Sequence, residues 1–181
     1  MQYFYQMFSA QFSIYFDTGG SPMSKSIVDV PPGKALRLGL RLPIWLYRSH
    51  LGWLLGERFL LLTHIGRNSR MPRQAVIEVV AHDRDTDMYY VVSGWGAKSD
   101  WYQNVRKTPS VIVQVAGRKF RADAEFIPVE KAIRILETYA REHPVAFREL
   151  SGLFLGERMK AGSDASRQLA ERMPMVAFRP K

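Results

Sequence analysis

Short apolar runs recur along the chain between residues 58 and 127. Over residues 110–117 hydrophobic and polar residues alternate strictly, a pattern typical of a strand with one buried face. Short runs rich in Val, Ile, Leu and Tyr predict strands over residues 58–66, 73–83, 87–94, 110–117 and 119–127. A final apolar run predicts a closing strand over residues 175–180.

A short helix is predicted between these strands at residues 99–109, where Pro109 stops it. The helical spacing of apolar residues predicts further helices over 128–143 and 163–173, and a helix or a loop over 144–156. This order of elements predicts an α+β, mainly β fold, in which an antiparallel sheet curls into a small barrel with flanking helices.

The N-terminal part of the chain follows a different pattern. Residues 1–22 are aromatic and end in Gly-Gly-Ser-Pro, so we expect either a mobile arm or an artefact of upstream translation, with residues 23–181 forming one domain. Residues 33–56 contain no acid, and helical spacing places four cations on one face, namely Lys34, Arg37, Arg41 and Arg48. This amphipathic helix either packs on the domain or lies on an anionic membrane.

The amino-acid composition excludes several kinds of functional site. The chain has 181 residues, a net charge of +9 and no cysteine, which excludes disulfides, zinc–thiolate sites and thiol catalysis. The four histidines show no metal-ligand spacing, so no metal is expected. The positive charge calls for an acidic partner, such as nucleic acid, a membrane surface or a phosphorylated cofactor. No nucleic-acid-binding motif, phosphate loop or nucleophile–base pair occurs, so in an enzyme a cofactor would carry the chemistry and the catalytic residues stay unknown.

Two segments are candidates for a ligand site. The segment 67–73 carries Arg67, Arg70 and Arg73 without an acid, and it fits a phosphate or carboxylate, or else is a solvated basic loop.

The second segment, "SGWGAKSDWYQNV", begins at Ser93. Its glycines permit close approach of a ligand, Lys98 precedes a helix start, and the aromatic side chains offer flat faces for a ring. Alternatively, Ser99 and Asp100 only cap the helix and Trp101 fills the core. In either case one aromatic of the Trp-Tyr pair at 101–102 is expected in the core.

The stretches "LLTHIGRNSRMPR", "YVVSGWGAKSDWYQNVRKTPSVIVQVAGRKFRADAEFI" and "PMVAFRP" together resemble the deazaflavin-dependent nitroreductase family, over roughly residues 60–180. The resemblance implies the FMN-binding split β-barrel fold, with the deazaflavin coenzyme F-420 in a groove. It also implies hydride transfer from the reduced coenzyme to a flat electrophile such as a quinone or a nitro compound. The acceptor pocket would be built from the N-terminal helix and the region 139–155.

The resemblance also assigns residues to the site. The residues implied for the phosphate and the polyglutamate tail of the coenzyme are Gly66, Arg67, Asn68, Ser69, Pro72 and Arg73. Those expected beside the deazaflavin ring are Ser93, Gly94, Lys98, Trp101 and Asn104. Asn68 and Gly94 stand where family members often have lysine, and Lys98 is a candidate to replace one of those charges.

Alternatives to the F-420-dependent reductase are a split-barrel reductase that uses FMN and a non-catalytic module that binds a flavin-like molecule or a lipid. The expected partner is a small-molecule acceptor, with no nucleic acid. A homodimer and peripheral contact with an anionic membrane are further expectations. The expected location is the cytoplasm, including the inner face of the membrane.

Overall fold

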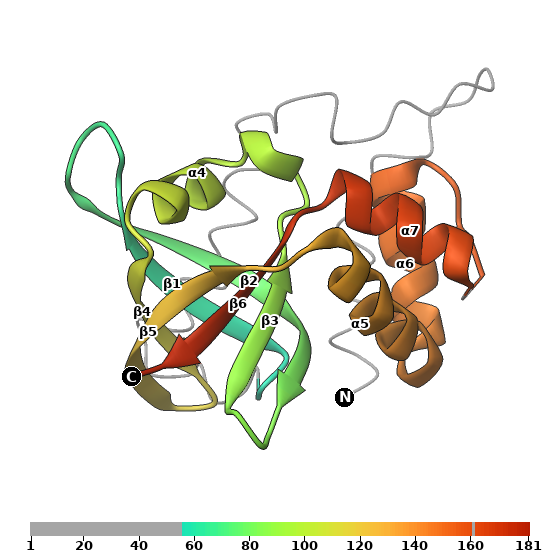
Figure 1. Ribbon diagram of the computed structural model, residues 1–181, viewed down its shortest axis with the longest axis horizontal. Helices are drawn as coiled ribbons and strands as arrows, with labels where there is room; N and C mark the ends of the chain where they lie inside the picture. Colours follow the sequence, from blue (N-terminus) through green and yellow to red (C-terminus); the bar gives the residue numbers. More distant parts are fainter. Residues whose placement is uncertain (1–55, 161) are drawn as a thin grey trace.

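The computed structural model describes residues 56–160 and 162–181, in which six strands and four α-helices follow one another (Figure 1). The predicted N-terminal helix and its basic face lie outside these residues. The elements are β1 (Phe59–Ile65), β2 (Pro72–Asp83), β3 (Met88–Val92), η3 (Gly96–Lys98), α4 (Asp100–Lys107), β4 (Ser110–Val115), β5 (Arg118–Phe126), α5 (Val129–Glu142), α6 (Pro144–Leu155), α7 (Ser163–Arg172) and β6 (Met175–Pro180).

The six strands form a closed antiparallel barrel in the order β1-β2-β3-β6-β5-β4, which confirms the predicted fold class. Closure comes from β4, which pairs with β1 over Leu61–Gln114 to Thr63–Ile112. A bulge in β2 between Val79 and Ala81 shifts its register against β3. The β4–β5 turn needs positive φ at Ala116 (47°) and Gly117 (81°), the geometry of a tight hairpin whose twist matches its strands.

The barrel interior is filled by the inward positions of the strands. Alternate residues of β1, Leu60 and Leu62, pack in this core with Val91 and Val113, as the two-residue period requires. α4 is amphipathic, and its buried residue Val105 packs into the same core, so that the helix covers one end of the barrel (Figure 1).

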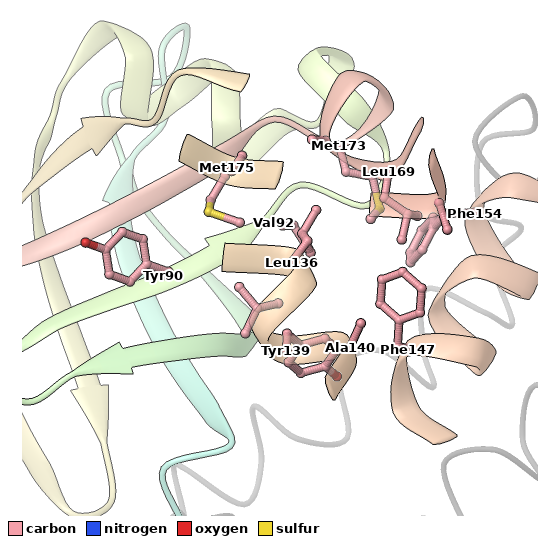
Figure 2. Packing of buried hydrophobic residues seen from close by; sticks show 14 of the residues in the cluster. Tyr90, Val92, Leu136, Tyr139, Ala140, Phe147, Phe154, Leu169, Met173 and Met175 are labelled. Atoms are coloured by element: carbon pink, nitrogen blue, oxygen red, sulfur yellow. The ribbon is translucent and has the colours of Figure 1, made fainter. Parts of the chain in front are cut away.

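A second core joins the barrel to the helices. α5, α6 and α7 pack beside β3 and β6, and a cluster of apolar side chains fills the space between them (Figure 2). Leu136 from α5, Phe147 from α6 and Leu169 from α7 are fully buried there. The segment 144–156, for which the sequence left helix or loop open, is therefore helical because its aromatic face is buried.

Candidate functional site

The two candidate segments come from the same rim of the barrel. β1 and β3 are each antiparallel to β2, so they run in the same direction and their carboxyl ends share one rim. The loops 66–71 and 93–99 leave the barrel there, and α4 lies across this rim (Figure 1).

The 66–71 loop is held by bonds of its own. The Gly66 N–H donates to Met71 O at 2.9 Å, and the Arg70 N–H donates to Gly66 O at 2.9 Å. An ideal Cβ on Gly66 would lie 2.6 Å from Ser69 Oγ, so a side chain there would displace the serine. The hydroxyl of Ser69 accepts a long bond of 3.5 Å from Arg73 Nη2. The loop is therefore compact, and it presents Arg70 and Arg73 on an exposed surface.

Arg67 faces the helix rather than solvent. Its backbone N–H donates to Asn104 Oδ1 at 2.9 Å, and its Nη1 donates to Asp100 Oδ1 at 2.8 Å and to Asn104 Oδ1 at 3.2 Å. Lys107 Nζ donates to Arg67 O at 3.0 Å. Asn104 is only 5% exposed. Arg67 and Asn104, which the sequence predicted as site residues, therefore hold the 66–71 loop against α4.

A buried histidine completes this network. Since Asn104 Oδ1 accepts from Arg67, its Nδ2 is the donor to His64 Nδ1, 3.3 Å away. His64 is 4% exposed, on the inward face of β1. The pKa of His64 is lowered to about 4, chiefly by burial and also by the positive charge of Arg73, and Asp100 partly opposes both effects. The imidazole is therefore neutral at physiological pH and serves as a hydrogen-bond acceptor.

The 93–99 loop is held in place by hydrogen bonds of the buried residue Ser93. The Ser93 hydroxyl donates to Gly96 O at 2.8 Å, and the Ser93 N–H donates to Pro174 O at 3.0 Å. Ser93 is fully buried, so its side chain shapes the turn and only the outer backbone of the loop can face a ligand. An ideal Cβ on Gly94 would lie 2.5 Å from Phe154 Cζ, so this side of Gly94 faces α6.

The two aromatic residues at the start of α4 differ in their burial. Tyr102 is 8% exposed and packs edge-on against Phe126, so it is the core member that the sequence left undecided. Trp101 is half-buried, with its ring edge-on to Tyr102. Lys98, at the end of η3, and Asn68, in the 66–71 loop, are exposed.

The residues at this rim fit an anionic ring cofactor. Among the described residues, Arg70, Arg73 and Lys98 form no salt bridge, and Asp100 at the start of α4 is already paired with Arg67. The indole N–H of Trp95 is buried and has no acceptor among the described residues. Cations without carboxylate partners suit phosphate and carboxylate groups, and an unpaired donor suits a ring carbonyl.

Sequence reasoning found the loops but missed several of their supports. The acid, amide and ammonium groups of α4 at positions 100, 104 and 107 recur at helical spacing, a signal for one polar face that reaches the 66–71 loop. His64 continues the inward alternation of Leu60 and Leu62. Nothing in the sequence indicated Phe154, which is distant along the chain from Gly94.

The closed antiparallel barrel, the cationic rim and the glycine–tryptophan loop together fit a bound anionic ring cofactor. Among the described residues, no group of His, Asp or Glu side chains is arranged to hold a metal ion. The family of F420H2-dependent quinone reductases matches residues 40–149, more than half of the chain. The chain belongs to this family, so it is an oxidoreductase that uses coenzyme F-420 and acts on a small molecule.

Several solved structures are similar to the chain at low identity. An F420H2-dependent reductase is 18% identical, with 68% of this chain and 96% of that chain covered and a TM-score of 0.46. A pyridoxamine 5'-phosphate oxidase-related, FMN-binding protein from Nostoc punctiforme is 10% identical, with 84% and 82% covered and a TM-score of 0.47. A conserved hypothetical protein from Mycobacterium tuberculosis is 14% identical, with 74% and 79% covered and a TM-score of 0.46. No curated protein matches the chain.

Proposed function

We propose that this protein reduces a quinone with coenzyme F-420 bound at the rim made by the 66–71 loop, the 93–99 loop and α4. The observation that carries the proposal is the set of exposed cations at this rim that form no salt bridge among the described residues. The coenzyme has an anionic tail and a flat ring, and the rim offers cations beside a half-buried tryptophan.

Each part of the rim has a distinct task in this proposal. Arg70 and Arg73 bind the tail, and Lys98 adds charge beside the ring. Trp101 and the outer backbone of the 93–99 loop hold the ring flat, while Asn104 keeps the loop and the helix in register. When bound, the reduced coenzyme supplies a hydride; with one proton, this converts a quinone to its hydroquinone.

Anaerobic turnover tests the proposed function. The protein is mixed with reduced F-420 and either a water-soluble quinone or a nitroaromatic compound, and oxidation of the coenzyme is followed by absorbance. We expect faster turnover with the quinone. Faster reduction of the nitro compound would replace the acceptor in this proposal, and turnover with reduced FMN in place of reduced F-420 would favour the FMN alternative.

Arg73→Ala should weaken coenzyme binding, because Arg73 is exposed at the rim and forms no salt bridge among the described residues. Loss of one charge-assisted hydrogen bond raises Kd roughly 5- to 100-fold. The measurement is quenching of coenzyme fluorescence. Arg84→Ala is the matched control, since Arg84 is exposed and pairs with Glu57 away from the rim loops. Equal Kd values for the two variants would remove Arg73 from the site.

We further propose that the basic face of residues 33–56 brings the protein to an anionic membrane, where lipid-dissolved quinones reside. This face lies outside the described residues, and the argument rests on its acid-free sequence. In the described part of the chain, no helix is both long and apolar enough to cross a bilayer. The expected homodimer also stays a prediction.

Liposome flotation measures the proposed membrane contact. The protein should float with anionic vesicles at low salt and less so at high salt, because each basic residue near the surface contributes about 1 kcal/mol that salt screens. Neutral vesicles are the control. A protein that stays at the bottom of the gradient with anionic vesicles contradicts the proposal and leaves the helix a structural role.

A further inference from the structure

Gly94 lies against an aromatic ring from the helical layer. An ideal Cβ on Gly94 would lie 2.5 Å from Cζ and 2.6 Å from Cε1 of Phe154. Carbon atoms in van der Waals contact are about 3.5–4.0 Å apart, so any side chain at position 94 would collide with this ring. The glycine is therefore required by a protein side chain that comes close to the loop from inside.

Phe154 has little freedom to yield. The residue is 8% exposed, and it belongs to the core between the barrel and the helices. Figure 2 shows the ring near Phe147 of the same helix and close to Leu169 and Met173. Because protein cores are packed about as densely as organic crystals, a shift of the ring would have to displace these neighbours.

A second contact supports the same loop from α7. Gly96 has a φ of 63°, and an ideal Cβ on it would lie 3.0 Å from Arg172 O. The guanidinium of Arg172 donates through Nη1 to Phe154 O at 3.4 Å. Both glycines of the 93–99 loop therefore rest on the carboxyl ends of α6 and α7, which are themselves joined by Arg172.

We propose that Phe154 is a positioning residue for coenzyme binding. Its ring fixes the position of the 93–99 loop relative to the cationic 66–71 loop. This inference rests on the proposed function, in which the outer face of the 93–99 loop holds the coenzyme ring. It also gives a physical reason for a glycine at position 94, since a side chain there and the ring of Phe154 exclude each other. The helical layer is thereby coupled to the cofactor loop through one aromatic contact.

A double-mutant cycle tests this coupling. Gly94→Ala introduces a methyl group that collides with the ring, and Phe154→Leu removes the colliding atoms, so the two changes together should relieve the clash. Dissociation constants for oxidised F-420 are measured by fluorescence quenching for the wild type, both single variants and the double variant. Thermal unfolding without coenzyme is measured for the same four proteins. Gly152→Ala is the control, because its Cβ would lie 2.7 Å from Cγ of Arg158 and its nearest neighbours all belong to that residue rather than to Phe154.

The expected result is a rise in Kd of about tenfold or more for Gly94→Ala in the wild-type background. In the Phe154→Leu background, the same change should raise Kd by no more than about threefold. Gly152→Ala should bind the coenzyme like the wild type. This pattern would show that a side chain at position 94 weakens coenzyme binding through its contact with Phe154.

Two outcomes would overturn the inference. Gly94→Ala can raise Kd equally in both backgrounds, in which case the methyl group meets the coenzyme directly. The two substitutions can also be coupled in the unfolding temperature but leave Kd unchanged, in which case Phe154 is only a core residue. Failure of the proposed function is seen separately, as a wild-type protein that binds F-420 but transfers no hydride to a quinone.

Discussion

Replacing Asn104 with leucine should destabilise the protein and weaken coenzyme binding together. The change leaves the Arg67 N–H and His64 Nδ1 without their shared partner in a buried site. A buried polar group without a partner costs about 1–3 kcal/mol, so we expect a loss of roughly 2–5 kcal/mol in the free energy of unfolding. Denaturant unfolding measures this loss. The Kd for the coenzyme should also rise, because the 66–71 loop is no longer held against α4.

Gln103→Leu is the matched control for this prediction. It replaces a neighbouring amide whose Nε2 makes one exposed hydrogen bond of 3.3 Å to Ala97 O. We expect the loss in the free energy of unfolding to stay below about 1 kcal/mol, as is usual for an exposed hydrogen bond. Similar losses in the two variants would mean that the network of Asn104, Arg67 and His64 does not stabilise the rim.

The fold was predictable because its signals are local. Alternation places Leu60 and Leu62 on one face of β1, and Pro109 marks the end of α4, so the predicted boundaries differ from the observed ones by at most two residues. Antiparallel order followed from the short connections between strands, and the closed barrel confirms it. In such a case, each segment carries enough information to define its own element.

The interior of the site was less predictable because its contacts join distant parts of the chain. Arg67 and Asn104 were both expected at the coenzyme, and the structure shows them bonded to each other across the rim. Gly94 was interpreted as room for a ligand, and the structure places Phe154 against the side where its Cβ would point. The approach of a ligand to the outer side of the loop stays a prediction. A glycine indicates that something comes close, but the sequence does not say whether the neighbour is a ligand or a side chain.

His64 should make folding stability depend on pH between about 4 and 6.5. Its pKa is lowered from 6.5 to about 4 in the folded state, so in this range the unfolded chain binds more protons. The stabilising contribution is complete above pH 6.5 and is lost as the pH falls toward 4. A shift of this size corresponds to about 3 kcal/mol in the free energy of unfolding. The charged groups that act on the imidazole are Arg73 from β2 and Asp100 from α4.

Two variants separate this titration from other acid effects, with unfolding measured in urea at several pH values. His64→Gln keeps an acceptor for Asn104 but does not titrate, so the loss of stability between pH 6.5 and 4 should shrink. Asn104→Asp places a carboxylate beside Nδ1, which favours the charged imidazole and should raise the pKa of His64. The lowered pKa values of Asp83 and Asp87 act below their ordinary value of 3.8, outside this range. An unchanged pH profile in both variants would show that His64 is not the titrating group.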